Sequence, residues 1–596
     1  MSTAADVRPL GATPHEQGVA FRVWAPHATQ VSVIGSFNGW DGGKHPLQAE
    51  ENGNWSANVP EARVGDQYRY LLTTPAGQFK RIDPYAREVT SSIGNAIVHD
   101  TRFDWQGDDF HLAPWNELVI YELHVGTFND ESDDTSPGEF KGVSARLGHL
   151  KKLGINAIQP MPVGEVAGDR SWGYNPAHIF SVETVYGGPL AFKQFVRRAH
   201  QHGIAVILDV VYNHLGPGDL DLWQFDGWSE NNLGGIYFYN DGRAKTPWGE
   251  TRPDYGRNEV RQFILDNVLM WFEEYHVDGL RFDCTEFIRT INGSSDQDLP
   301  EGWSLMQWIN SEVARRFPGR ITIAEDMQNN QWLTKDVGAG GAGFGSQWDA
   351  NFVHPIRQAV ITPDDRQRSL LAIRDALDQR YNDDAFDRVI YSESHDEVAN
   401  GRARVPQEVN PKDPKGWYAQ KRSTLAAALV FTAPGIPMLF QGQEFLQGEW
   451  FRDTVPLDWD QRDEFHGIVR LYRDLIRLRL NRGGTTRGLC GQFIQVHHLH
   501  DERKVLSYHR WDQAGPGDDV VVVANFLHEP QGDGYVIGFP APGLWKLRFN
   551  SDWNGYSDDF EGHPSTDVVA EAGEHDGLPW YGKLTIGPYS VLIYSQ

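Results

Sequence analysis

Residues 205–214 read Ala205-Val206-Ile207-Leu208-Asp209-Val210-Val211-Tyr212-Asn213-His214, a short apolar run that leads into acidic and polar residues. A short apolar run rich in valine and isoleucine is typical of a strand buried on both faces of a parallel sheet. Similar runs recur along the chain, separated by amphipathic stretches such as 258–273. They are 118–121, 157–158, 279–282, 321–324, 346–348, 389–391 and 437–440. Eight such units in about 370 residues predict an α/β fold, a (β/α)8 TIM barrel with insertions.

Both flanks of this central region alternate apolar and polar residues as β-strands do. Val19, Phe21 and Val23 alternate with their neighbours near one end, and apolar strand-like runs such as 520–523 follow the last helical stretch near the other. At 596 residues the chain also exceeds the size at which single cores stop growing. We therefore expect an N-terminal β-sandwich at 1–107, the catalytic barrel at 108–485 and a C-terminal β-sandwich, all β, at 486–596.

The segment 214–258 follows the third apolar run and is too long for an ordinary connection between a strand and a helix. It is rich in aromatic residues, namely Trp223, Trp228, Tyr237, Tyr239 and Trp248. Long loops on a barrel commonly carry function, so we predict an excursion that faces the substrate.

The composition of the chain limits the kinds of molecule that it is expected to bind. The chain holds 54 Lys and Arg against 81 Asp and Glu, a net charge of -27, which disfavours nucleic acid and anionic membrane surfaces. The same charge is also explained by solubility alone. Cys284 and Cys490 are the only cysteines, and residues 1–10 lack the pattern of a signal peptide. We expect a cytoplasmic protein, a monomer or weak homo-oligomer.

Acidic residues that follow four of the eight apolar runs are the candidates for chemistry. They are Asp209, Asp283, Glu325 with Asp326, and Asp396. A single acid at such a place is more often a helix cap. In a (β/α)8 barrel, however, the carboxyl ends of all strands open onto one pocket, so four acids together indicate an active site.

Glycoside chemistry explains why acids would gather there. One carboxylic acid protonates the leaving oxygen while a second carboxylate, about 5 to 5.5 Å away in retaining enzymes, attacks the anomeric carbon. Asp283 and Glu325 end neighbouring runs. Arg281 stands two residues before Asp283, so strand alternation points both to one side, where the guanidinium would keep Asp283 ionised. Glu325 would need a raised pKa to act as the acid. Alternation would point Cys284 the other way, as a packing residue.

Four short motifs with this order and spacing resemble those of the α-amylase family, glycoside hydrolase family 13. They are Asp209-Val-Val-Tyr-Asn213-His214, Gly279-Leu-Arg281-Phe-Asp283, Ala324-Glu325-Asp326 and Ser394-His395-Asp396-Glu397. The resemblance implies that Asp283 forms a glucosyl-enzyme intermediate, that Glu325 is the acid/base and that Asp396 grips two sugar hydroxyls.

The same resemblance implies further substrate-binding residues. His214 and His395 would hydrogen-bond the sugar, and Asp209 would support Arg281. Tyr174, in Trp172-Gly173-Tyr174-Asn175-Pro176, matches a tyrosine that stacks under the sugar being cleaved, although a loop-packing role remains an alternative. Trp248 in the long loop is the last candidate.

The flanking domains resemble parts of the family as well. The N-terminal one is similar to a family 48 carbohydrate-binding module, where Trp40 and Trp55 are candidates to touch sugar, and the C-terminal one is similar to the family's β-domain. Alternatively, the N-terminal domain is only a rigid spacer.

Within the family, Ser394-His395-Asp396-Glu397-Val398 and the segment 534–543 resemble 1,4-α-glucan branching enzymes, which transfer a cleaved chain to form an α-1,6 branch. Leu215-Gly-Pro-Gly218 and Thr246-Pro-Trp-Gly249 instead resemble hydrolases, either an α-amylase or a maltooligosyltrehalose trehalohydrolase. A non-catalytic glucan-binding protein is a third hypothesis, which predicts a replaced catalytic acid, yet all three acids are present. The mechanism implies no cofactor and no essential metal, although a structural calcium ion stays open.

Overall fold

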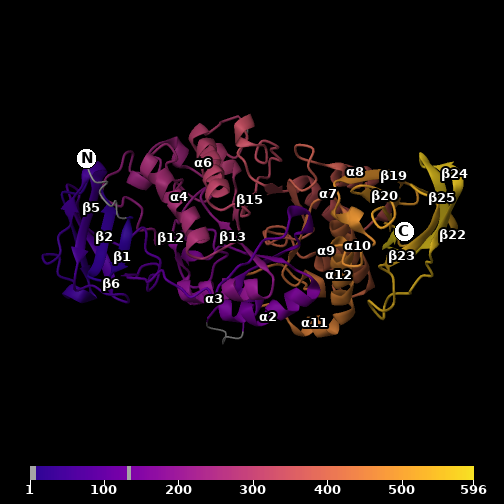
Figure 1. The fold of residues 1–596 in the computed structure, drawn as a ribbon, viewed down its shortest axis with the longest axis horizontal. Helices are drawn as coiled ribbons and strands as arrows, with labels where there is room; N and C mark the ends of the chain where they lie inside the picture. Colours follow the sequence, from indigo (N-terminus) through magenta and orange to yellow (C-terminus); the bar gives the residue numbers. More distant parts are fainter. Residues whose placement is uncertain (1–8, 131–135, 295) are drawn as a thin grey trace.

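The computed structural model describes residues 9–130, 136–294 and 296–596. Figure 1 shows an elongated molecule with the N-terminal strands at one end, the C-terminal strands at the other and a barrel with its helices between them. Within these residues, no helix is both long enough and apolar enough to cross a bilayer.

Eight parallel strands close into a barrel in the middle of the chain. They are β9 (Ile120–Leu123), β10 (Ala157–Pro160), β13 (Ala205–Val210), β14 (Gly279–Phe282), β15 (Ile321–Ala324), β16 (Ser346–Trp348), β17 (Arg388–Ile390) and β18 (Ile436–Phe440). The hydrogen-bonded order is β10-β13-β14-β15-β16-β17-β18-β9, which closes because β9 also pairs with β10. All eight predicted runs are strands of this barrel, so the predicted fold class is confirmed.

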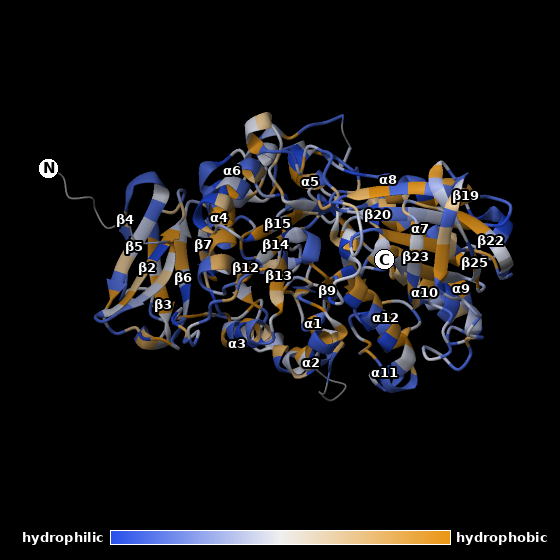
Figure 2. Ribbon diagram, turned by 45° about the vertical axis from the view of Figure 1, so that its right-hand side comes forward, coloured by the Kyte–Doolittle hydropathy of each residue, from blue (hydrophilic) through white to orange (hydrophobic). Residues whose placement is uncertain are grey.

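Helices surround the barrel because their apolar stripes have only the outer face of the strands to cover. The longer ones are α2 (Phe140–Leu153), α3 (Gly188–Gln201), α4 (Asn258–Glu273), α6 (Pro300–Arg316), α7 (Ala350–Ile361), α8 (Leu370–Asp378), α10 (Trp417–Thr432) and α12 (His466–Arg479). The short ones are α1 (Val125–Phe128), α5 (Glu286–Arg289), α9 (Val405–Val409) and α11 (Asp460–Glu464). In Figure 2 apolar residues concentrate on the strands, while helices such as α12 show both colours.

The N-terminal domain is a sandwich of two four-stranded sheets. One has the order β1-β2-β5-β4, and the other has the order β3-β6-β7 with β8 paired to β6. Their bounds are β1 (Gly11–His15), β2 (Gly18–Trp24), β3 (Gln30–Gly35), β4 (Gln48–Ala49), β5 (Asn54–Val59), β6 (Gln67–Thr74), β7 (Gly77–Arg81) and β8 (Ala96–Ile97). Phe21 from one sheet packs edge-on against Tyr68 from the other, with ring centroids 5.0 Å apart, so one core holds both sheets together.

The C-terminal domain is antiparallel throughout. Its strands are β19 (Phe493–His500), β20 (Val505–Trp511), β21 (Val520–Asn525), β22 (Gln531–Phe539), β23 (Gly543–Asn550), β24 (Val568–His575), β25 (Leu578–Ile586) and β26 (Ser590–Ser595). They form one hydrogen-bonded path in the order β19-β20-β21-β26-β23-β24-β25-β22, where the sequence predicted a sandwich. Residues from both halves of the path, such as Val521 and Phe539, share one core.

The long segment 214–258, after β13, contacts two parts of the molecule. Its first part packs on the N-terminal domain, because Trp228 stacks on His27 with centroids 4.8 Å apart and Tyr237 meets Trp24 edge-on at 5.4 Å. Its last part turns toward the barrel mouth, where Trp248 stacks on His214. The predicted excursion toward substrate therefore applies only to its final residues. A short hairpin, β11 (Gly164–Val166) and β12 (Pro176–Val182), lies on the loop after β10.

Candidate active site

Acidic side chains collect at the carboxyl ends of neighbouring barrel strands. In the register of β13 and β14, Asp209 lies opposite Arg281. In the register of β14 and β15, Phe282 lies opposite Ala324, so the next residues, Asp283 and Glu325, leave their strands side by side. The strand order therefore brings together acids that are 42 residues or more apart in sequence.

Arg281 is the fully buried centre of this group. Its Nη1 atom lies 2.8 Å from Asp209 Oδ2 and 3.0 Å from Asp283 Oδ1. Its Nη2 atom forms an ion pair with Glu325 Oε2 at 3.0 Å, without the alignment of a hydrogen bond. The guanidinium also lies over the ring of Trp348, 4.2 Å from its centroid. One cation thus fixes three carboxylates whose mutual repulsion would otherwise separate them.

Asp283 is held at both oxygens. Arg281 donates to Oδ1, and the side-chain amide of Asn213 donates to Oδ2 at 2.8 Å. These two donors fix the orientation of the carboxyl group. Arg281 and Asp283 point to the same side of β14, as strand alternation predicts.

Glu325 carries the electrostatic signature of a proton donor. Burial raises the pKa of Glu325 to about 7, and the repulsion from Asp283 and Asp396 acts in the same direction against the opposing effect of Arg281. The backbone N–H of Cys284 donates to Oε2 at 2.7 Å. Arg281 contacts the same oxygen, so the proton of the acid form belongs on Oε1.

One carboxylate oxygen of Asp283 and one of Glu325 lie within 4.8 Å of each other. That separation matches retaining glycosidases, whose two carboxyl groups stand about 5 to 5.5 Å apart, and not inverting ones, which need room for a water between them. The Cys284 thiol lies within the same distance of both oxygens. Burial and the adjacent carboxylates raise the pKa of this thiol, so it stays protonated and is a poor metal ligand.

His395 joins Asp396 to the rest of the site. Its Nδ1 atom lies 2.6 Å from Glu122 Oε1, and its Nε2 atom lies 3.3 Å from Asp396 Oδ2. Burial alone would lower the pKa of His395, but Asp396 and Glu122 raise it far above its ordinary value, so the ring is an imidazolium. For Asp396, burial alone would raise the pKa, but His395 and Arg281 lower it to about 2. Asp396 is half-buried, with 39% of its side chain open to solvent.

Two aromatic rings flank the acids. Tyr174 donates its hydroxyl to Asp209 Oδ2 at 2.7 Å and stacks on His395, with centroids 4.9 Å apart and planes 20° apart. Trp248 stacks on His214 at 4.6 Å and 12°, and remains 39% exposed. Burial lowers the pKa of His214 to about 4, so this ring is neutral. The structure therefore brings all nine predicted site residues to one barrel mouth. They are Asp283, Glu325, Asp396, Tyr174, Asp209, His214, Arg281, His395 and Trp248.

Four residues of the site were missed from sequence. Glu122 directly follows the first apolar run, so the strand-end pattern that found the other acids also marks it. Asn213 stands inside the first of the four motifs, where no role was predicted for it, and Trp348 ends the apolar run 346–348. Glu286 is buried beside Glu325, and burial together with Glu325 raises its pKa to about 9, which makes it a neutral acid. No motif pointed to it.

The prediction that Cys284 points away from the site is wrong. Strand β14 ends at Phe282, so alternation no longer applies two residues later. Cys284 has a φ of 42°, in the left-handed region, and its backbone N–H donates to Glu325 Oε2. In the N-terminal domain, Trp40 is 39% exposed, whereas the indole N–H of Trp55 is bonded to Ala25 O.

Comparisons with known proteins cover almost the whole chain. Residues 9–86 match carbohydrate-binding module 48 (isoamylase N-terminal domain), residues 123–223 and 223–458 match the α-amylase catalytic domain, and residues 496–596 match the α-amylase C-terminal all-β domain. The 1,4-α-glucan branching enzyme GlgB of Rhodospirillum rubrum is 31% identical over 622 residues, covering 98% of this chain and 81% of that protein. GlgB of Aliivibrio fischeri is 31% identical as well, over 97% of this chain and 82% of its own length.

Solved structures share the fold at lower identity. A putative α-amylase from Salmonella typhimurium superposes with a TM-score of 0.74 at 22% identity, over 98% of this chain and 99% of that one. A pullulanase from Anoxybacillus, solved with maltotetraose, gives a TM-score of 0.76 at 22% identity, over 100% of this chain and 88% of that one.

Proposed function

The chain belongs to the α-amylase family, and from this premise we propose that it is a retaining 1,4-α-glucan branching enzyme. The observation that carries the chemistry is the spacing of Asp283 and Glu325, whose carboxylate oxygens lie within 4.8 Å on neighbouring strands. The transfer to a branch point is supported by the near full-length similarity to branching enzymes at 31% identity.

In the first step, the ionised Asp283 attacks the anomeric carbon of an α-1,4-linked glucose residue. Glu325 transfers the proton from Oε1 to the leaving oxygen, the carbon–oxygen bond breaks, and the chain remains joined to Asp283 as an ester. A pKa of about 7 for Glu325 suits this role, because the group keeps its proton near neutral pH yet releases it readily.

In the second step, Glu325 is a carboxylate and acts as a base. It removes the proton from the 6-hydroxyl of a second glucan, whose oxygen attacks the anomeric carbon and releases Asp283. If water takes the place of that hydroxyl, the same steps give hydrolysis. Only the acceptor distinguishes the two reactions.

Other side chains hold the sugar between these groups. Asp396, which reaches solvent and is kept ionised by His395 and Arg281, would accept hydrogen bonds from two adjacent sugar hydroxyls. Tyr174 lies against His395 and offers an aromatic face to the apolar side of the ring. The neutral His214 and its partner Trp248 would contact the sugar from the long loop.

Incubation with amylose separates branching from hydrolysis. A branching enzyme removes the iodine colour while reducing ends stay nearly constant, and debranching of the product with isoamylase then releases short chains. Reducing sugar that grows in step with the loss of colour would refute transfer and indicate an amylase. Trehalose released from maltooligosyltrehalose would indicate the trehalohydrolase.

Asp283→Asn is the matched test of the mechanism itself. It keeps the size of the side chain but removes the nucleophile, so the loss of iodine colour should slow by at least about 10⁴-fold. An unchanged rate in a folded Asp283→Asn protein would show that Asp283 is not the nucleophile. Only a folded wild-type protein that cleaves no glucan at all would support the glucan-binding hypothesis.

The proposal also covers the location of the enzyme, its oligomeric state, its cofactor requirement and its domain bounds. We place it in the cytoplasm as a monomer or weak homo-oligomer that needs no cofactor, with domains at 1–107, 108–485 and 486–596. A net charge of -27 and two free cysteines are compatible with this setting. Size-exclusion chromatography with light scattering measures the oligomeric state, and treatment with EDTA tests whether activity depends on a metal.

A further inference from the structure

The two ends of the C-terminal strand path meet each other. Strand β19 stands first and β22 last in the hydrogen-bonded order, so each has one edge without a neighbour in the path. His498 on β19 and Tyr535 on β22 nevertheless touch, with Nε2 of the ring 2.7 Å from the tyrosine hydroxyl. The side chains of His498 and Tyr535 therefore connect the edges of β19 and β22, which are not paired in the strand path.

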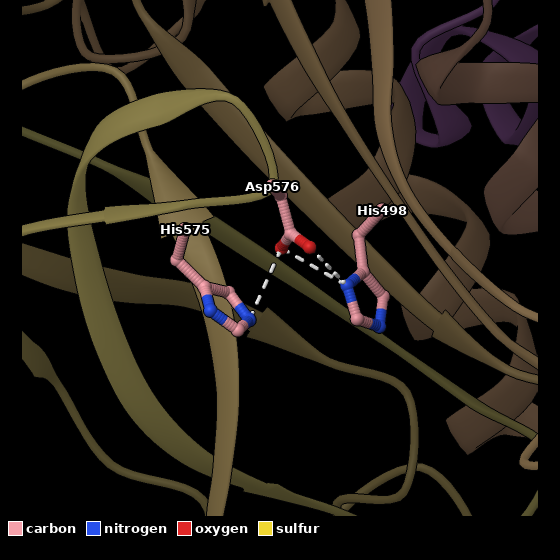
Figure 3. A group of neighbouring side chains, drawn as sticks. All are labelled: His498, His575 and Asp576. Carbon is pink, nitrogen blue, oxygen red and sulfur yellow. Dashed lines mark hydrogen bonds and ion pairs between the residues drawn. The ribbon is translucent and has the colours of Figure 1, made fainter.

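A cluster of two histidines and an aspartate occupies this junction. Figure 3 shows His498 and His575 on either side of Asp576, both turned toward its carboxylate. His498 Nδ1 lies 2.9 Å from Asp576 Oδ2, and His575 Nε2 lies 3.7 Å from the same oxygen. One atom from each residue falls within 4.8 Å of the others.

A tight turn fixes the positions of two members of this cluster. His575 pairs with Leu578, which leaves Asp576 and Gly577 as a two-residue hairpin loop between β24 and β25. Their φ angles are 55° and 71°, as a type I′ turn requires, and Asp-Gly is a favoured sequence for it. The backbone N–H of Gly538 on β22 donates to Asp576 Oδ2 at 2.8 Å, so the carboxylate is aimed before any ligand arrives.

We propose that His498, His575 and Asp576 bind a divalent metal ion of the zinc type. Nδ1 of His498, Nε2 of His575 and a carboxylate oxygen of Asp576 supply the nitrogen and oxygen donors that Zn²⁺ accepts, and water completes the tetrahedron. Bonds of about 2.1 Å place tetrahedral ligand atoms about 3.4 Å apart, close to the 2.9 Å and 3.7 Å between the nitrogens and Asp576 Oδ2. The metal replaces the proton that His498 now shares with Asp576.

The residues around the cluster favour metal binding. When Nδ1 of His498 binds a metal, its Nε2–H donates to the Tyr535 hydroxyl, and such an outer contact fixes the tautomer and orientation of a ligand histidine. The side chains of His575 and Asp576 are 39% and 16% exposed, which gives the ion a path from solvent. The bound ion would connect β19 to the β24–β25 hairpin, whose Asp576 is in turn bonded to Gly538 on β22, the last strand of the path.

Zinc titration of the full-length protein tests the proposal. After removal of metal with EDTA and of EDTA by dialysis, we expect calorimetry to show Zn²⁺ binding that His575→Gln weakens by at least about tenfold. His111→Gln is the matched control, because His111 has a side chain 83% exposed outside the C-terminal strands. Cys284→Ser separates the site from the thiol beside the catalytic acids. Binding that survives in His575→Gln, or that disappears only in Cys284→Ser, would overturn the proposal.

Three further measurements check what the ion does. Tyr535→Phe keeps all three ligands but removes the outer hydroxyl, so Zn²⁺ affinity should fall by about 10- to 100-fold. Zn²⁺ should raise the midpoint of thermal unfolding of the wild-type protein but not of His575→Gln, because a ligand stabilises only the state that binds it. Glucan cleavage by His575→Gln should equal that of the wild type, which distinguishes this site from the catalytic one. An equal Zn²⁺-induced shift in both proteins would contradict a metal at this junction.

Discussion

The backbone N–H of Cys284 donates a hydrogen bond of 2.7 Å to Oε2 of Glu325. The residue that follows the proposed nucleophile therefore positions the proposed acid/base. Cys284 lies beyond the end of β14 at Phe282 and has a φ of 42°, in the left-handed region. The two catalytic groups are thus coupled through the main chain as well as through Arg281.

Cys284→Gly should keep most of the wild-type rate of glucan cleavage. Glycine retains the N–H and adopts a positive φ without strain, so the contact with Glu325 persists. Cys284→Pro removes the N–H, cannot adopt this φ, and should abolish cleavage. Initial rates on amylose, with thermal unfolding as a check on folding, compare the two variants. Strong inactivation by Cys284→Gly would instead assign a role to the thiol.

The pH dependence of kcat/KM should follow the proton on Glu325. The group acts when protonated, and its pKa is raised from the ordinary 4.5 to about 7. Activity should therefore persist through mildly acidic pH and fall tenfold per pH unit above about 7, with roughly one tenth remaining at pH 8. Initial rates between pH 5 and 9 measure this limb. A plateau that extends to pH 9 would show that Glu325 is not the acid.

The sequence was sufficient to predict the barrel because each buried strand is a short apolar run, and several of these runs lead into an acid at the same end. Asp209, Asp283 and Glu325 could be grouped on that rule alone, and the structure brings them around Arg281. The weak run 346–348 also proved to be a strand, β16, because the other strands require a partner there to close the barrel.

The residues that sequence missed depend on contacts across the fold. Cys284 was misplaced because strand periodicity says nothing once the strand has ended at Phe282. The aromatic composition of the loop 214–258 predicts an excursion that faces the substrate, but Trp228 and Tyr237 pack against the N-terminal domain, because composition does not distinguish a sugar platform from a domain interface. Nor does it show that His498 and Tyr535 would meet across two edge strands.

Arg281→Met should destabilise the barrel as well as inactivate it. The side chain is fully buried against Asp209, Asp283 and Glu325, and its loss leaves these acids without a counterion. Breaking a buried ion pair in this way costs about 3 to 5 kcal/mol of unfolding free energy. Thermal unfolding should show the catalytic domain melting earlier. Arg243→Met is the control, since Arg243 pairs with Asp241 at the surface and should cost less than about 1 kcal/mol.

Glu122→Gln should weaken sugar binding without removing a group that touches sugar. Asp396 and Glu122 together raise the pKa of His395, so loss of one charge lowers it, and the imidazolium loses its proton at a lower pH. The neutral ring then no longer pairs with Asp396 as a cation and holds that carboxylate less firmly, so KM for maltooligosaccharides should rise more steeply with pH than in the wild type. A purely structural role of Glu122 would change stability but leave the pH profile of KM in place. Glu312→Gln, on the surface of α6, is the control.

Trp248→Ala should lower kcat/KM on amylose by up to about tenfold, because an aromatic contact contributes about 0.5 to 1.5 kcal/mol. Trp248 stacks on the neutral His214 ring and keeps 39% of its surface exposed at the barrel mouth. Trp248→Phe preserves an aromatic face and should recover part of the loss. Trp553→Ala removes an equally exposed indole, 40%, from the C-terminal domain and should leave the rate unchanged. Equal losses in Trp248→Ala and Trp553→Ala would mean that the final part of the long loop does not contact glucan.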